Sequence, residues 1–139
     1  MVVPKNEIES FIPHRHPFVM IDNLLNVQSD MFKSDFYISE DNILIENGQF
    51  QEGGLIENIA QTCAASFGFL EKDKNDKPKI GYIGAISKVL IHELPPVNST
   101  ISTIVQPTHQ LGNIFMVQGR NYFEGRLLLE CEMKIVVTE

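Results

Sequence analysis

Residues 53–70 of the chain, from Gly53 to Leu70, read GGLIENIAQTCAASFGFL. Apolar residues recur at every fourth position in two ridges, one made of Leu55, Ile59, Cys63 and Phe67 and the other of Ile56, Ala60 and Ala64. Ridges on two neighbouring faces predict a helix that is covered on most of its sides rather than a helix on the surface. The one carboxylate of this helix, Glu57, lies in its first turn, and we expect that side chain to be partly buried.

Strand-like segments stand on both sides of this helix, because short runs rich in β-branched and aromatic residues end at turn residues. The patterns predict a short helix at 5–11, strands at 19–21, 24–27, 32–38, 80–92, 100–108, 114–123 and 127–137, a hairpin tip at Glu124-Gly125, and a solvated loop over 71–79. This order predicts one α+β domain over residues 1–139, in which an antiparallel sheet of five or six strands curls around the helix. Such a sheet cannot cover the helix on every side, so we expect a second chain to complete the burial.

The composition is that of a globular protein, with 43% hydrophobic and 21% charged residues among 139. A formal net charge of -7 argues against a nucleic-acid partner, which needs clustered Lys and Arg. Cys63 and Cys131 have no metal-ligand spacing, and we expect two small buried hydrophobic residues rather than a disulfide. The chain starts without the apolar core of a secretory signal, and no apolar run reaches the roughly 18 residues of a membrane span. We therefore expect a cytoplasmic protein.

Three stretches carry a resemblance to a known family. They are IPHRHPFVMID at 12–22, FQEGGLIENIAQTCA at 50–64 and YIGAISKVLIHELPP at 82–96. In this order they resemble the opening loop, the central helix and a following strand of the hot-dog fold dehydratases that act on 3-hydroxyacyl groups carried by acyl carrier protein. The trio Ala60-Gln61-Thr62 is more similar to a divergent subgroup from aryl-polyene or flexirubin-type pigment pathways.

The resemblance implies a hot-dog fold and loss of water from 3-hydroxyacyl thioesters, in fatty-acid or polyene-type biosynthesis. It implies no metal and no organic cofactor, with acyl carrier protein as a partner and a homodimer or a heterodimer with another hot-dog subunit as the assembly. Glu57 matches the family's catalytic carboxylate. Gln61, one turn further on, is expected to orient that carboxylate or line the substrate tunnel, or else to be satisfied by backbone. Gly53, Gly54 and Phe18 are expected to contact the substrate.

The family's catalytic histidine sits in a GHFPG motif, and this chain lacks it, because no His lies between His16 and His92. His14 is the better replacement candidate, although a loop histidine that only fixes its turn is the more common case. His92 and His109 are expected to be structural or on the surface. The missing histidine leaves open a non-catalytic acyl-binding or partner subunit. A further alternative is an acyl thioesterase, in which the helix carboxylate would activate water.

Basic residues offer a weaker indication of a carrier partner. Arg15, Lys72, Lys74, Lys77 and Lys79 would suit an acidic carrier protein, although solvation is the more common role of such charges. The sequence does not specify the length or type of the acyl chain.

Overall fold

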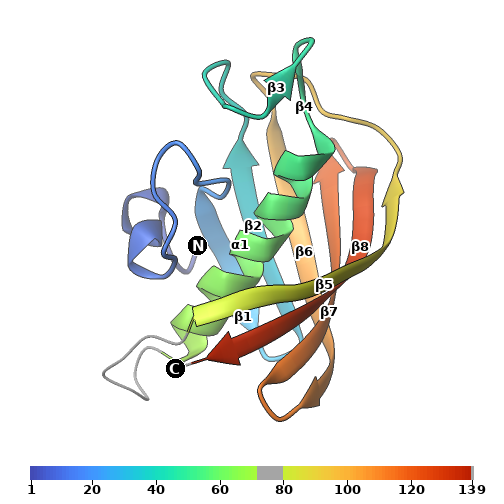
Figure 1. Cartoon of the computed structure of the whole chain (residues 1–139). Coiled ribbons are helices and arrows are strands. Elements are labelled where there is room, and N and C mark those ends of the chain that lie inside the picture. The colour runs from blue at the N-terminus through green and yellow to red at the C-terminus, as the bar shows by residue number, and fades with distance from the viewer. Residues whose placement is uncertain (72–79, 139) are drawn as a thin grey trace.

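One antiparallel sheet and one long helix make up most of the structure, a computed structural model that describes residues 1–71 and 80–138 (Figure 1). The elements are the 3-10 helix η1 Lys5–Ser10, the strands β1 Asn23–Gln28, β2 Met31–Tyr37, β3 Ile45–Glu46 and β4 Gln49–Phe50, the helix α1 Glu52–Glu71, and the strands β5 Ile80–Ile91, β6 Thr100–Leu111, β7 Ile114–Phe123 and β8 Arg126–Thr138. The predicted α+β class is confirmed. The loop expected at 71–79 lies outside the described residues from 72 onward.

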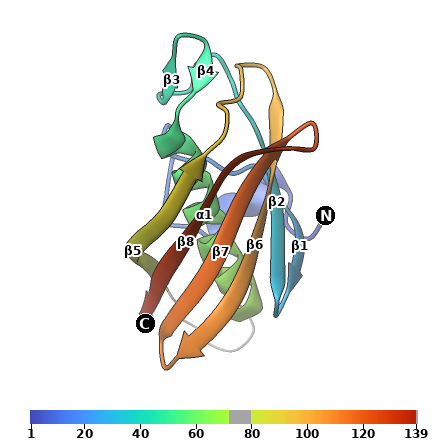
Figure 2. The same cartoon turned by 90° about the vertical axis from the view of Figure 1, so that its right-hand side faces the viewer.

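The large sheet has six strands in the order β1-β2-β6-β7-β8-β5, and every neighbouring pair is antiparallel. Figure 2 shows this sheet from the face that points away from α1, with the helix behind the curved strands. The predicted hairpin tip at Glu124-Gly125 is confirmed. Both residues have positive φ, 50° and 78°, as a two-residue hairpin turn of the I′ type requires.

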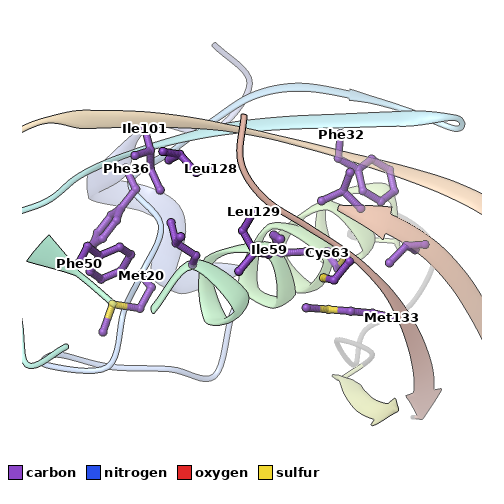
Figure 3. Packing of buried hydrophobic residues seen from close by; sticks show 14 of the residues in the cluster. Met20, Phe32, Phe36, Phe50, Ile59, Cys63, Ile101, Leu128, Leu129 and Met133 are labelled. Carbon is purple, nitrogen blue, oxygen red and sulfur yellow. The ribbon is translucent and has the colours of Figure 1, made fainter. Parts of the chain in front are cut away.

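The core lies between α1 and the sheet (Figure 3). Leu55, Ile59 and Cys63 of the first predicted ridge are fully buried there. The approach is close enough that a Cβ atom on Gly119 of β7 would lie 2.4 Å from Ile59 Cγ2, so this position has room only for glycine. The helix therefore packs directly on the sheet backbone at this point.

A third ridge of α1 is polar and was not predicted. Asn58, Thr62 and Ser66 are spaced four residues apart, and all three are completely buried. Thr62 Oγ1 donates a hydrogen bond to the Asn58 carbonyl at 2.7 Å and lies 2.7 Å from Ser34 Oγ of β2. Buried polar groups need such partners, and Asn58, Thr62 and Ser34 form a hydrogen-bonded cluster inside an otherwise apolar core, whereas Ser66 Oγ has no hydrogen-bond partner within the described residues.

The two cysteines are free and buried, as expected. Burial raises the pKa of the Cys131 thiol to about 11. Burial is also the larger cause of a raised pKa at the Cys63 thiol, and the nearby Cys131 raises it further. Both side chains therefore stay neutral at physiological pH and serve as small core residues.

The strand predicted at 19–21 is wrong. The Met20 N–H and C=O are satisfied by side chains of α1 rather than by a neighbouring strand. The sequence analysis also missed the short β3–β4 hairpin, although its turn, Asn47-Gly48, has the positive φ values typical of that dipeptide.

Strand β5 ends the sheet and pairs with β8 alone among the described strands. Several of its large apolar side chains are exposed to solvent: Tyr82, Ile83, Ile86, Val89, Leu90 and Ile91 are each at least 37% exposed. An apolar edge strand of this length is an unusual feature for a protein that works as a monomer.

Candidate functional site

Glu57 lies one turn into α1, and the imidazole of His14 lies beside it. His14 Nε2 is 3.4 Å from Glu57 Oε1, and the side chains are 32% and 36% exposed, respectively. His14 belongs to the loop between η1 and β1. The structure thus brings together the two residues that the sequence analysis proposed as catalytic, although they are 43 positions apart.

The second ring nitrogen of His14 is in a different environment. Nδ1 is buried and has no hydrogen-bond partner within the described residues. Nε2, by contrast, faces the Glu57 carboxylate, and both side chains are partly exposed to solvent. Only Nε2 is therefore placed to exchange a proton with Glu57 or with a bound molecule.

Gln61 combines the two roles that the sequence left open. Its Nε2 donates to Glu57 Oε1 at 2.9 Å, which orients the carboxylate. The same amide is satisfied by backbone, since Nε2 also donates to the Phe18 carbonyl at 2.9 Å and Oε1 accepts from the Met20 N–H at 2.6 Å. Gln61 is completely buried and has these three partners, so it orients the site from within the protein.

A cavity of about 230 Å³ opens beside the His14–Glu57 pair. Its lining comes from the loop, α1, β5 and β8: His14, Glu57, Ala60, Ala64, Gly81, Tyr82, Ile83 and Ile135. Apart from the pair itself, the lining is mostly apolar with small side chains on the helix. A pocket of this kind, with two convergent titratable groups, is the usual form of a small-molecule site.

The remaining residues proposed to contact substrate, Gly53, Gly54 and Phe18, are not among the residues that line this cavity. Gly53, in the first turn of α1, is exposed. At Gly54 the ring of Phe50 fills the space, because a Cβ atom there would lie 2.3 Å from it. The Phe18 side chain is 59% exposed, and its carbonyl holds Gln61.

The other histidines do not join the pair. His16 lines a separate hollow of about 830 Å³ between η1 and the end of β2. His92 Nε2 lies 3.4 Å from Glu130 on the sheet, and His109 is exposed beside Thr108.

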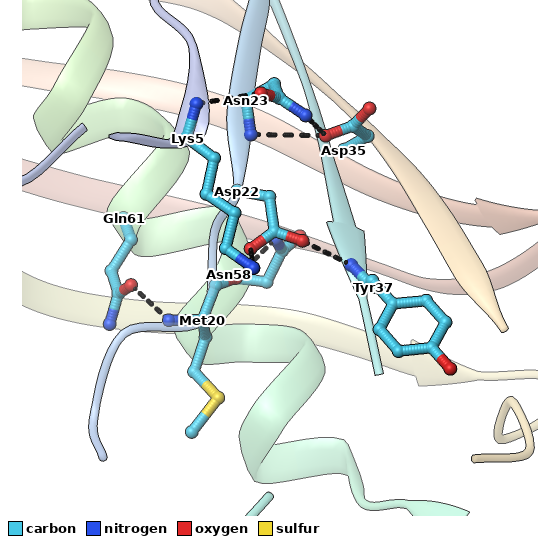
Figure 4. A network of polar contacts seen from close by, with 8 residues as sticks. All are labelled: Lys5, Met20, Asp22, Asn23, Asp35, Tyr37, Asn58 and Gln61. Carbon is cyan, nitrogen blue, oxygen red and sulfur yellow. Dashed lines mark hydrogen bonds and ion pairs between the residues drawn. The ribbon is translucent and has the colours of Figure 1, made fainter. Parts of the chain in front are cut away.

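Asp22 lies at the hollow that His16 lines. Figure 4 shows its carboxylate between Lys5, at 3.8 Å, and the Tyr37 N–H, which donates to it at 2.7 Å. Burial raises the pKa of Asp22, although the Tyr37 N–H and the Lys5 ammonium act against that rise and nearby Asp35 adds to it. The described network around Asp22 thus has no histidine in it, unlike the Glu57 site.

Two further findings concern the described residues only. No three His, Cys, Asp or Glu side chains gather closely enough to hold a metal ion within 1–71 and 80–138. Over the same ranges, no helix combines the length and the apolar character that crossing a membrane requires.

The chain is similar to known dehydratases over nearly its whole length. A family model described as ApeP-like, ApeP dehydratase, matches residues 6–137. The 3-hydroxyacyl-[acyl-carrier-protein] dehydratase FabZ of Wolinella succinogenes is 23% identical over 156 residues, covering 100% of this chain and 98% of the relative. FabZ of Geotalea uraniireducens is 25% identical, covering 96% of each.

Among solved structures, the dehydratase heterocomplex ApeI:P from Xenorhabdus doucetiae superposes with a TM-score of 0.85 at 17% identity, covering 95% of this chain and 91% of the other. A hypothetical thioesterase with coenzyme A from Streptococcus pneumoniae gives a TM-score of 0.68 at 12% identity, with 84% of each covered. These likenesses confirm the hot-dog fold. Since the family model spans almost every residue, the chain belongs to the ApeP-like dehydratase family.

Proposed function

We propose that this chain removes water from 3-hydroxyacyl groups held as thioesters on acyl carrier protein, in fatty-acid or polyene-type biosynthesis. Membership of the ApeP-like dehydratase family and the likeness to FabZ enzymes support this activity. The observation that carries it is the 3.4 Å approach of His14 Nε2 to Glu57 Oε1 beside an apolar cavity. In this pair, the imidazole of His14 would replace that of the GHFPG histidine, which this chain lacks.

The reaction needs a base for a proton on C2 and an acid for the hydroxyl on C3. The thioester carbonyl makes the C2 proton removable by taking up negative charge as it leaves. The first N–H groups of a helix have no partners within the helix, and its N-terminus favours negative charge. We place the thioester oxygen near exposed Gly53, at the start of α1, where these groups stabilise the charge.

The pair completes the proton balance when it begins with one proton, held on Glu57. His14 Nε2 takes the proton from C2, and the electrons of that C–H bond form the C2–C3 double bond. The C3–O bond breaks, and the leaving hydroxyl takes the Glu57 proton and departs as water. The proton on His14 then returns to Glu57 across their 3.4 Å contact, which restores the starting state. Each proton transfer uses only these two side chains and the substrate.

We further propose that a second hot-dog subunit docks along β5. Within the described part of the chain, one edge of this strand has no partner strand, and its exposed apolar side chains include Tyr82, Ile86 and Leu90. Tyr82 and Ile83 also line the cavity, so a subunit seated there would cover the site from solvent. The partner is a second copy of this chain or a different hot-dog protein, as in the heterocomplex that the fold resembles.

We also propose that acyl carrier protein binds beside the site, and one described residue supports this. Arg15 is exposed next to His14 and is placed to meet an acidic carrier protein. The four lysines considered for the same role, from Lys72 to Lys79, lie outside the described residues.

The direct test is an assay of the purified chain with 3-hydroxyacyl carrier protein, alone and mixed with candidate hot-dog subunits, in which mass spectrometry follows the enoyl product. We expect product in at least one pairing and a loss of about 10²- to 10⁴-fold in Glu57→Gln. Glu124→Gln, at the exposed hairpin tip, is the matched control and should behave as the unaltered chain. No enoyl product in any pairing, or full activity of Glu57→Gln, would overturn the proposal.

The second candidate is a non-catalytic subunit, favoured by the absence of the GHFPG histidine. In that case the chain would raise the activity of a partner, and Glu57→Gln would leave that effect intact. An acyl thioesterase would instead release free acid in the same assay. The likeness to the thioesterase structure supports that reading only through the shared fold.

A further inference from the structure

Two buried amides of α1 hold the backbone of the loop that carries His14. Asn58 Nδ2 donates to the Met20 carbonyl at 2.7 Å, and Gln61 Oε1 accepts from the Met20 N–H at 2.6 Å. Gln61 Nε2 also donates to the Phe18 carbonyl at 2.9 Å. Figure 4 shows Met20 with both amides reaching toward it from the helix. Residues 18–20 are thus attached to α1 by three hydrogen bonds.

The Asn58 amide is fixed in turn from the sheet. Thr103 Oγ1 of β6 donates to Asn58 Oδ1, and Asn121 Nδ2 of β7 donates to the same oxygen at 3.0 Å. These donors direct the oxygen of the amide to the sheet and leave its NH₂ group for Met20. Asn58 therefore acts as a link from the rigid sheet to the loop, and an apolar residue of similar size cannot make both connections.

The loop transmits this anchoring to His14. The Phe18 N–H donates to the Arg15 carbonyl at 2.8 Å. Arg15 Nη1 donates to the His14 carbonyl at 2.7 Å and to the Ile12 carbonyl at 2.9 Å. The contacts return to the helix where His14 meets Glu57, which Gln61 orients from the other side. The chain of contacts closes into a ring, so movement at Met20 changes the distance between the two catalytic side chains.

We propose that Asn58 is a positioning residue: its link from the sheet to Met20 sets the separation of the His14 imidazole and the Glu57 carboxylate. The catalytic meaning of this link rests on the function proposed above, whereas the link itself can be tested without turnover. Misplacement of catalytic groups by about 1 Å can cost about 100-fold in rate. The pair would thus lose its acid–base geometry without any change in its own residues.

The first experiment compares Asn58→Ala with Ser34→Ala in the turnover assay. Ser34 belongs to the same buried cluster and bonds Thr62, but it has no recorded bond to the loop. We expect kcat to fall at least about tenfold in Asn58→Ala with KM within about twofold, and both to stay near the unaltered values in Ser34→Ala. Equal losses in the two variants would overturn the proposal, because they would reflect only the loss of a buried hydrogen bond.

The second experiment needs no activity. In NMR spectra, Glu57→Gln as a single substitution should shift the ring signals of His14. The same substitution added to Asn58→Ala should leave these signals nearly unchanged. Amide exchange at Met20 should also become at least about tenfold faster in Asn58→Ala than in Ser34→Ala. An unchanged Met20 exchange rate together with an unchanged response of His14 would overturn the link, even if the protein proves not to be a dehydratase.

A second variant covers the case in which Asn58→Ala does not fold. Arg15 is exposed, so Arg15→Lys keeps the fold and the charge but loses the guanidinium that serves two carbonyls at once. We expect a loss of about threefold to tenfold in kcat and a weaker response of the His14 ring signals to Glu57→Gln. An Arg15→Lys variant that matches the unaltered protein in kcat and in these signals would contradict the proposed ring of contacts.

Discussion

Two histidine–glutamate pairs in the described part of the chain have the same separation. His14 Nε2 lies 3.4 Å from Glu57 and His92 Nε2 lies 3.4 Å from Glu130. The first pair joins a loop to the helix α1, and the second joins the end of β5 to its neighbour β8. The distance between the two side chains therefore cannot by itself distinguish a catalytic pair from a surface pair.

The surroundings of the two pairs do distinguish them. Besides its contact with His14, Glu57 accepts a hydrogen bond from Gln61, and the His14 loop is held to the helix at Met20. A cavity of about 230 Å³ adjoins this pair. The His92 side chain is 47% exposed and lies over the sheet. Catalysis needs a place for the substrate and groups held in position, and the pair at α1 has both.

The largest expected effect comes from replacing each histidine in turn. His14→Asn should lower kcat/KM for the dehydration of 3-hydroxyacyl carrier protein by about 10³-fold, because it removes the group that exchanges the C2 proton. His92→Asn should stay within about twofold of the unaltered protein. Equal losses in the two variants, measured at equal amounts of folded protein, would remove the distinction between the pairs.

The sequence predicted the features that depend on local patterns. The i, i+4 ridges located α1, and alternation with turn residues located the strands after it, with the 114–123 strand correct at both ends. Glu57 and His14 were proposed as catalytic residues through a resemblance to family motifs, not from these local patterns. The helix and these strands can be predicted because neighbouring residues alone indicate them.

The features that were missed depend on contacts between distant residues. Val19 to Ile21 has the composition of a strand, yet Met20 pairs with Asn58 and Gln61, about 40 positions away. Nothing in the local pattern indicates such partners. Asn58 itself gave a signal that was overlooked, since it begins a polar ridge in a helix otherwise predicted to be buried.

A smaller effect tests whether the cavity matters to the first pair. Gly81 lines it, and a Cβ atom there would lie 3.2 Å from Ile135 Cγ2. One methyl group in an apolar pocket changes discrimination by about 10- to 200-fold, so Gly81→Ala should lower kcat/KM by about tenfold. Gly84→Ala is the matched control on β5, because its Cβ atom would meet Val136 Cγ2 at a similar 3.3 Å and Gly84 does not line the cavity.

The cavity assignment depends on the difference between these two glycine variants. Both add one methyl group to the same strand with a similar contact distance, so their costs in stability should be similar. Thermal unfolding measures that cost in stability, and the turnover assay measures the change in kcat/KM. If Gly84→Ala lost as much activity as Gly81→Ala, the loss would come from distortion of β5 and the cavity would have no role.

The smallest effect concerns Asp22, a carboxylate on the same loop whose partner is Lys5 rather than a histidine. Burial raises its pKa above the ordinary value of 3.8, so the folded protein binds this proton more tightly than the unfolded chain does. The contribution of Asp22 to stability is therefore fully present below pH 3.8 and is lost as the pH rises through the folded-state pKa.

Asp22→Asn lacks this titration. We therefore compare the free energies of unfolding of the two proteins. The value for the unaltered protein minus the value for the variant should fall from pH 3.8 through the folded-state pKa and become constant above it. Urea unfolding across a pH series measures this difference. Curves that run parallel throughout would mean that burial does not affect Asp22. A loss of turnover in Asp22→Asn would instead mean that the catalytic site extends beyond the His14–Glu57 pair.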